Sequence, residues 1–332
     1  MSLKKRVLVG VLISIIFLFL AFYKADFVEV WKALRRANYI YIVPNILLLL
    51  LASWFRAYRW RFMVKPIKNV KTSSLFSSTM IGLMANNLLP ARLGELVRAY
   101  ASGEKEKISR SASFATIVVE RVFDGFAILF IFWLALAFSP FPDWVRKGAN
   151  VILIVNLALL LVLIFLELRP GATINFLQKI LVFLPPALSR KISQIMLKFT
   201  DGLKVFRSWK DMLWIVVWSL VIWGMLGISN YFVLMAFDLH PPFQASFIVL
   251  IFVSFVISLP SAPGFIGTFQ WACVAALSLY GIPADSAQAF SIVLWACQYF
   301  PVTGIGLFYL KKEHLSLKRV EKEAEREQEG IS

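Results

Sequence analysis

Long apolar runs recur along the chain of 332 residues at intervals that suit membrane-crossing helices. Six of these runs are long enough to cross the hydrocarbon core of a bilayer, which needs about 20 helical residues. They cover residues 7–23, 39–55, 112–138, 150–166, 212–237 and 286–310. Proline and glycine interrupt two further apolar regions, 73–90 and 244–280. We therefore predict an all-α polytopic membrane protein with six full transmembrane helices and two broken or re-entrant segments, up to eight spans in all.

Charged and amphipathic stretches flank these runs. Within residues 172–208, apolar side chains recur at helical spacing and Lys and Arg fill the other positions, which is typical of helices that lie on anionic lipid. Residues 26–36 indicate a similar helix on the outer face. Residues 311–332 carry charges of both signs and few apolar side chains, so we expect a solvated cytoplasmic tail. Residues 1–310 then form a single integral membrane domain, without a soluble stretch of catalytic-domain size.

The composition supports this class: 59% of the residues are hydrophobic and 16% are charged, against about 25% charged in soluble domains. A net charge of +16 would suit a nucleic-acid partner, but most of the 35 Lys and Arg residues fall on one predicted side of the membrane. One acid-free block follows the second span: Arg56, Arg59, Arg61, Lys65, Lys68 and Lys71. By the positive-inside rule, we predict a multi-pass protein of the plasma (inner) membrane with both termini in the cytoplasm, and no nucleic-acid partner.

The first interrupted region contains two asparagines and a proline before its helix could finish crossing. Proline removes a backbone donor, and hydrocarbon supplies no water for the carbonyl that loses its partner. We therefore favour a re-entrant segment that lines a cavity over a cytoplasmic loop with surface ion pairs. The candidate residues of this break are Asn86, Asn87, Pro90, Arg92, Gly94, Glu95 and Arg98.

The second interrupted region stops at Pro260 and resumes after Pro263, Gly264 and Gly267. Its glycines permit a positive φ, and the free amides where the helix resumes could hold an anionic group such as phosphate. A tight turn between two full spans fits the same pattern. Both breaks share Leu-Pro-x-x-x-Gly, and by the predicted topology they enter from opposite faces, as an inverted repeat requires.

Three charged residues, Glu120, Arg121 and Asp124, lie inside the predicted span 112–138. Glu120 lies roughly 12 Å from the start of that span, near the middle of the bilayer. Unpaired charges at this depth cost several kcal/mol, so we expect pairing with Arg92 or Arg98. A structural ion-pair lock is one interpretation. We favour a functional cluster, because apolar packing would hold the helices equally well. Its six members, without net charge, are Arg92, Glu95, Arg98, Glu120, Arg121 and Asp124.

Three ordered motifs carry a family resemblance: Asn-Asn-Leu-Leu-Pro-Ala-Arg-Leu-Gly-Glu-x-x-Arg, Glu-Arg-x-x-Asp and Pro-x-x-Pro-Gly-x-x-Gly. Together they resemble the lysylphosphatidylglycerol synthase transmembrane region, or flippase-like integral membrane family, over essentially the whole chain. In bifunctional members this region precedes a soluble aminoacyltransferase domain and is implicated in moving the modified lipid between leaflets. We expect no such domain here and do not carry over the synthase activity. Gln270 stands where the resemblance implies an acidic residue, and we include it among the headgroup-binding candidates.

The residues and the resemblance together predict a flippase-like protein that binds or moves a phospholipid or polyprenyl-linked headgroup, a transporter rather than an enzyme. One alternative is an intramembrane lipid-modifying transferase with Glu120 or Asp124 as general base. Another is a non-catalytic lipid-binding accessory of a separate synthase, which would be a partner enzyme. We predict no cofactor and no metal, because the His and Cys residues have no ligand spacing and no Walker-type loop is present.

Overall fold

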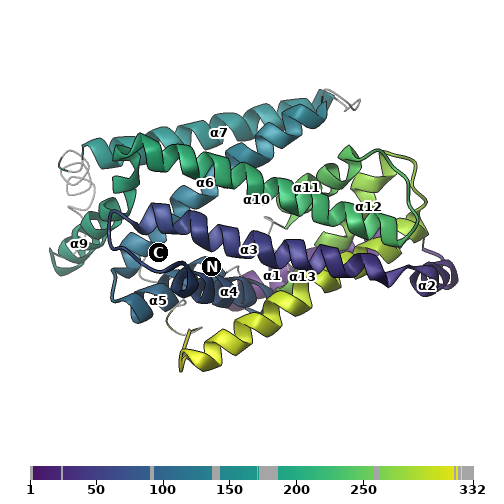
Figure 1. Cartoon of the computed structure of the whole chain (residues 1–332), viewed down its shortest axis with the longest axis horizontal. Helices are drawn as coiled ribbons and strands as arrows, with labels where there is room; N and C mark the ends of the chain where they lie inside the picture. The colour runs from purple at the N-terminus through teal and green to yellow at the C-terminus, as the bar shows by residue number, and fades with distance from the viewer. Residues whose placement is uncertain are drawn as a thin grey trace.

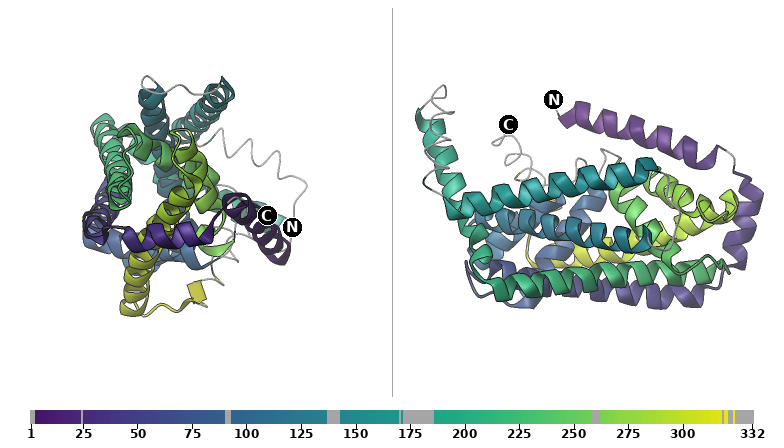
Figure 2. Two further views of the ribbon diagram at one scale, coloured as in Figure 1. Left: turned by 90° about the vertical axis from the view of Figure 1, so that its right-hand side faces the viewer. Right: turned by 90° about the horizontal axis from the view of Figure 1, so that it is seen from above.

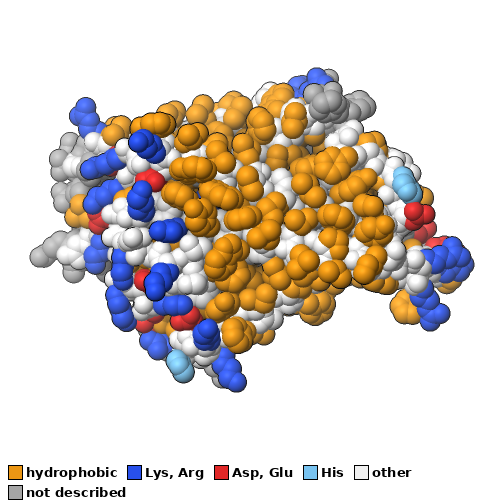
Figure 3. Space-filling model, in the orientation of Figure 1, with side chains coloured by type: hydrophobic (Ala, Val, Ile, Leu, Met, Phe, Trp, Pro, Cys, Tyr) orange, Lys and Arg blue, Asp and Glu red, His pale blue; other side chains and the backbone are white. Residues whose placement is uncertain are grey.

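The computed structural model describes residues 3–23, 25–89, 93–136, 143–169, 171, 186–257, 262–317, 319–320 and 323, and within these ranges the regular structure is entirely helical. The longer helices run along the long axis of an elongated bundle (Figure 1). Hydrophobic side chains cover the middle of the face in Figure 3, and Lys and Arg gather at one end. We call this the basic end. An apolar belt between charged ends is the surface of a membrane-embedded protein, so the predicted class is confirmed.

Four described helices are long and apolar enough to cross a membrane. The first is α3 (Ile42–Val64), which the short 3-10 turn η1 (Tyr39–Tyr41) extends at its start. The others are α7 (Asp143–Leu168), α10 (Trp209–Ala236) and α13 (Ala284–Lys312). They correspond to the predicted spans 39–55, 150–166, 212–237 and 286–310.

The predicted number of six full spans is not confirmed: four helices meet the criteria, or five if one bent pair counts as a span. The predicted span 7–23 is α1 (Leu3–Phe22), which joins α2 (Phe27–Arg36) at an angle of 81°. The predicted span 112–138 corresponds to α6 (Arg110–Leu136). Its 27 residues extend about 40 Å, long enough to cross a membrane. Because three charged residues lie near its centre, α6 is not among the four helices that are apolar enough to cross a membrane.

Two helices lie at the ends of the bundle. At the end opposite the basic one, α2 lies across the bundle (Figure 2), and the side chain of Asp26 caps its first amides. At the basic end, α9 (Pro186–Leu203) continues into η4 (Lys204–Arg207). The carboxyl end of α9 packs closely on α6, because a Cβ added at Gly202 would lie 2.3 Å from a carbonyl oxygen of α6. Residues 172–185 of the predicted interfacial region lie outside the described residues.

The first interrupted region forms a helical hairpin of α4 (Thr72–Leu88) and α5 (Gly94–Glu106). Its arms pack closely: Cβ atoms added at Gly82 and Gly94 would lie 2.8 and 2.2 Å from the carbonyl oxygen of the other glycine. The amide of Gly94 also donates to Oδ1 of Asn86 at 2.8 Å. At the open end, the hydroxyl of Ser74 donates to Glu106 at 2.5 Å. The hairpin therefore enters and leaves the bundle from the basic end (Figure 1).

The second interrupted region forms another hairpin, α11 (Gln244–Val256) and α12 (Thr268–Ser278), with the short turn η5 (Pro263–Phe265) before α12. Gly264 and Gly267 take φ values of 75° and 89°, the left-handed region that favours glycine. The two hairpins occupy opposite halves of the bundle in Figure 1, and their tips meet where η5 contacts α4. The indole of Trp295 on α13 fixes this tip by donating to the carbonyl of Gly264 at 2.7 Å.

The described part of the tail is partly packed: Lys311, Lys312, His314, Ser316 and Arg319 are exposed, as predicted, but other residues contact the bundle. Val320 is fully buried in an apolar cluster with residues of α5. Arg110 bonds Glu323 at 3.0 Å and Glu104 at 2.8 Å, and the second bond lowers the pKa of the Glu104 carboxyl. An apolar contact and an ion pair thus join the tail to the basic end of the bundle.

Candidate functional site

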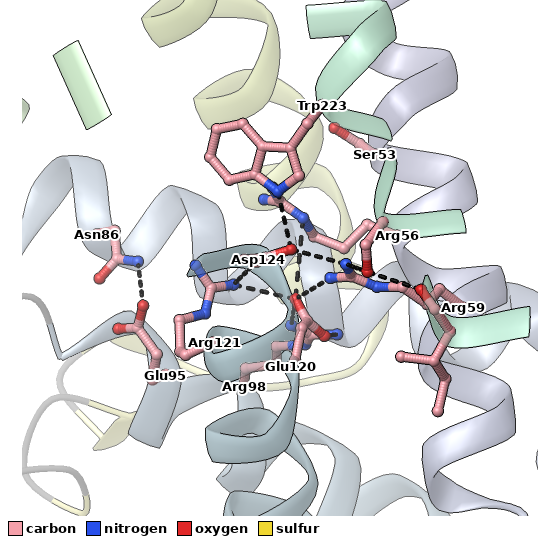
Figure 4. A network of polar contacts seen from close by, with 12 residues as sticks. Ser53, Arg56, Arg59, Asn86, Glu95, Arg98, Glu120, Arg121, Asp124 and Trp223 are labelled. Carbon is pink, nitrogen blue, oxygen red and sulfur yellow. Dashed lines mark hydrogen bonds and ion pairs between the residues drawn. The ribbon is translucent and has the colours of Figure 1, made fainter. Parts of the chain in front are cut away.

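A cluster of charged side chains lies inside the bundle between α3, α5 and α6 (Figure 4). Helical spacing produces it, because residues three or four apart share a helix face. Its members are Arg56 and Arg59 of α3, Arg98 of α5, and Glu120, Arg121 and Asp124 of α6. We call these six side chains the interior cluster.

Glu120 is at the centre of the interior cluster and has no exposed side-chain surface. Arg98 contacts its Oε2 at 2.9 Å. Arg59 and Arg121 contact its Oε1 at 3.2 and 3.0 Å, and Nε of Arg56 lies 3.8 Å from the same oxygen. A buried carboxylate is tolerated when surrounding cations and donors replace its lost hydration. The predicted pairing with Arg98 is present.

Asp124 links the cluster to α10. It accepts from Arg59 at 2.6 Å and from the indole Nε1 of Trp223 at 3.0 Å, and Arg121 lies 3.5 Å away. The same Nη1 of Arg59 donates to the hydroxyl of Ser219 at 2.6 Å. Arg59 therefore ties three helices together in a fully buried position, as the structural-lock interpretation requires.

Arg98 is also held from its other side. Its guanidinium lies 3.8 Å from the ring centroid of Trp60, a cation–π contact that gains strength in a site without water. The indole of Trp60 in turn donates to the hydroxyl of Thr116 at 2.8 Å. These contacts hold Arg98 beneath Glu120 and away from open space.

A cavity of about 470 Å³ opens beside the interior cluster. Arg56, Arg121 and Asp124 line it, whereas Arg59, Arg98 and Glu120 do not. The side chain of Arg121 is 40% exposed, but that of Arg59 is not exposed at all. The cluster therefore has a buried layer that joins helices and a layer that faces the cavity.

The tips of both hairpins supply further walls of this cavity. The first hairpin contributes Asn86, Asn87 and Glu95, and the second contributes Gly264. The side-chain amide of Asn86 donates to Glu95 at 3.5 Å. Asn87 also donates to the hydroxyl of Thr303 on α13 at 2.9 Å. Apolar residues cover much of the remaining wall, among them Leu49, Ile128, Leu226, Phe265 and Phe269.

The structure places the sequence-predicted residues in three groups. Those that line the cavity are Asn86, Asn87, Glu95, Arg121, Asp124 and Gly264. Those that act in the surrounding framework are Arg98, Glu120, Gly94, Pro263, Gly267 and Gln270. Pro90, Arg92 and Pro260 lie outside the described residues.

Gln270 occupies a helix-capping position. Its side-chain oxygen accepts from the amide of Gly267 at 2.7 Å, and the side chain is buried, away from the cavity wall. This contact satisfies an amide at the start of α12 that would otherwise lack a partner. A direct contact of Gln270 with a headgroup therefore stays a prediction.

Two members of the interior cluster, Arg56 and Arg59, were assigned from the sequence to the cytoplasmic basic block. The reason is that the predicted span ends at residue 55, whereas α3 continues to Val64. No proline or glycine follows residue 55 within α3, and this was the signal that the helix continues. Among the described residues, four arginines of the interior cluster thus stand against three carboxylates that belong to it or line the cavity beside it, those of Glu95, Glu120 and Asp124.

Within the described residues, no group of three His, Cys, Asp or Glu side chains is placed to hold a metal ion. The acids of the interior cluster instead contact arginines. The arrangement is suited to binding a polar group inside a bilayer by hydrogen bonds and charge.

The fold and the cavity define a multi-pass α-helical membrane protein with two opposed hairpins around a polar interior. The chain belongs to the lysylphosphatidylglycerol synthase TM region family, whose model matches residues 7–306. The resemblance inferred from the three motifs is thereby confirmed.

Several relatives of this chain are described as UPF0104 membrane proteins. A UPF0104 membrane protein of Methanocaldococcus jannaschii is 25% identical over 304 residues, which cover 86% of this chain and 89% of that protein. A UPF0104 membrane protein of Methanothermobacter thermautotrophicus is 22% identical over 294 residues, covering 84% and 87% of the two chains. No solved structure matches this chain.

Proposed function

We propose that this protein is a flippase-like carrier, which binds the headgroup of a membrane lipid in the cavity and moves it between leaflets. The acyl or prenyl chains remain in the bilayer while the headgroup passes the polar interior. The family name refers to a phospholipid synthase, which supports a phospholipid as the substrate class.

The meeting of the two hairpin tips is the observation that carries this proposal. Asn87 and Gly264 come from hairpins that enter from opposite ends, and both line the same cavity. In many transporters, paired interrupted helices from inverted halves place the substrate site near the midplane, where either side can reach it. Two hairpins with close-packed arms and a shared cavity suit such alternating access.

The chemistry of the cavity favours binding over catalysis. Arg121 presents a guanidinium to the cavity, a group that binds phosphate by two parallel hydrogen bonds. Glu120 and Asp124, the candidates for a general base, are each held by arginines. A carboxylate in such contacts serves better to orient its cationic neighbours than to abstract a proton.

Translocation is testable in vesicles that contain the purified protein and a phospholipid with a fluorescent acyl chain. A membrane-impermeant reductant bleaches the outer leaflet, so the bleached fraction exceeds about one half only when lipid crosses. We expect crossing with the native protein and a loss of about tenfold in rate with Arg121→Gln, the value of one charged hydrogen bond. Arg61→Gln removes an exposed arginine from α3 and should leave the rate unchanged. Equal bleaching with native protein, with Arg121→Gln and without protein would refute the proposal.

A further inference from the structure

The arginines of the site differ in how closely they contact carboxylates. Arg59 and Arg98 make close contacts with acids below the cavity, at 2.6 and 2.9 Å. Arg56 has one ion pair within the described part of the chain, and that pair is long, at 3.8 Å from Nε to Glu120. The buried Nε atoms of all four arginines have no hydrogen-bond partner among the described residues, so the arginines differ in their ion pairs. The arginine with the weakest acid contact among the described residues, Arg56, therefore lies at the cavity wall.

These two arginines are neighbours. Both approach the same oxygen, Glu120 Oε1, from the side of the cavity, at 3.8 Å for Arg56 and 3.0 Å for Arg121. One comes from α3 and the other from α6 (Figure 4), and both line the cavity; we call the part of its wall that they supply the cationic recess. Two adjacent guanidiniums form a recess suited to a phosphate, whose several oxygens can accept from both.

The acids beside this recess are already engaged. Glu120 contacts four guanidiniums, and Asp124 contacts two together with the indole of Trp223. Of the carboxylates that line the cavity, Glu95 alone has no arginine partner in the described residues, and it is bonded to Asn86. With four arginines against three acids among the described residues, this part of the site has an uncompensated positive charge before a ligand enters. An anionic headgroup would neutralise this charge, whereas a cationic headgroup would add to it.

We infer that the cavity selects lipids with a net negative headgroup, and that the phosphate binds between Arg56 and Arg121. This inference rests on the proposed function and names its substrate class. Zwitterionic and cationic headgroups are then poor ligands, although Glu95 offers one contact for an amine. Asn230 also lines the cavity and supplies a polar side chain for a second group of the headgroup.

Binding of short-chain lipids to the full-length protein in nonionic detergent tests the charge preference. The lipid probes are dihexanoyl phosphatidylglycerol, dihexanoyl phosphatidylethanolamine and a dihexanoyl lipid with an aminoacylated, cationic headgroup. Glycerol phosphate and inorganic phosphate serve as free anions. Titration calorimetry should give an affinity for phosphatidylglycerol about tenfold or more above that for the other lipids, the scale of one charge-assisted hydrogen bond. Free phosphate at equal concentration should not displace the lipid; displacement would assign the site to a soluble anion and overturn the inference.

Variants separate the recess from the general charge of the protein. Arg56→Gln and Arg121→Gln should each lower the binding affinity for phosphatidylglycerol about tenfold. The affinity for phosphatidylethanolamine should change by less than about threefold. Arg61→Gln removes an exposed arginine from the same helix as Arg56 and should change neither affinity. If Arg121→Gln fails to fold because it also loses its contact with Glu120, Arg56→Gln still decides, since its native pair is long.

Failure of the inference differs from failure of the proposed function. Translocation that is equally fast for all three headgroups would overturn the charge preference and leave the carrier function intact. Tightest binding of the cationic lipid, lost in Glu95→Gln, would reverse the assignment of the recess. The absence of both lipid binding and translocation would overturn both proposals.

Discussion

Replacing Glu120 by glutamine removes the negative charge at the centre of the interior cluster while preserving the size of the side chain. The amide can still accept one hydrogen bond, but its NH₂ group would face the nitrogens of Arg98 or of Arg59 and Arg121. Arg98 has no other acid partner among the described residues and is 4% exposed. The substitution therefore leaves at least one buried guanidinium without a counter-charge.

Removing one partner of a buried ion pair costs about 3–5 kcal/mol. The remaining contact of Arg98 with the ring of Trp60, at 3.8 Å, offsets about 1–2 kcal/mol of this at most. A net loss of about 1–4 kcal/mol lowers Tm by roughly 2–12 °C, taking about 2–3 °C per kcal/mol for a chain of this size. The effect should be present with no lipid ligand added, because it arises from contacts within the protein.

The two cysteines provide the assay. Cys273 and Cys297 are free and buried, so a dye that fluoresces on reaction with thiols reports unfolding as the temperature rises. The matched control is Glu29→Gln, which breaks a surface pair with Lys32 in which both side chains are 51% exposed. Such a pair contributes less than about 1 kcal/mol. If Glu120→Gln and Glu29→Gln shift Tm equally, Glu120 is not the centre of a buried charge network.

Three further predictions concern the hairpins. Gly94→Ala should lower Tm by several degrees in the thiol assay, because the added Cβ would lie 2.2 Å from a carbonyl oxygen of α4. The control Gly148→Ala should not lower Tm, because its added Cβ would have nothing within 4 Å. Asn87→Ala removes a 2.9 Å hydrogen bond to α13 and should lower the free energy of unfolding by about 1 kcal/mol, seen as a lower Tm in the same assay. An unchanged Tm would contradict the role of Asn87 in holding the hairpin tip. If the first hairpin is re-entrant from the basic end, an impermeant thiol reagent should label Lys107→Cys only from the cytoplasmic side and Lys32→Cys only from the outside; labelling of both from one side would refute this topology.

Much of the fold follows from the sequence because a bilayer imposes strong local constraints. An apolar run of sufficient length must be helical, since only a helix satisfies its own backbone within hydrocarbon. This constraint predicted α3, α7, α10 and α13 from composition alone. It also predicted the two breaks, because proline and glycine in an apolar run have local effects on the backbone.

The number of spans was not predictable by the same means. The length of α6 permits a crossing, but Glu120, Arg121 and Asp124 give it a composition that differs from that of an apolar helix. Their burial depends on α3 and α5, which are distant in the sequence. Similarly, Val320 is buried because α5 presents an apolar surface to it, which the charged composition of the tail does not reveal.

The sequence by itself determined that the protein is a helical membrane protein, that two of its segments are interrupted, and that charges lie within one helix. Only the tertiary structure decided which charges meet. Arg56 and Arg59 belong to the interior cluster because α3 extends beyond its most apolar part and packs against α6. Pairing between helices is a property of distance in space, and the order of residues along the chain does not fix that distance. The same holds for the cavity, which exists because the tips of two hairpins meet.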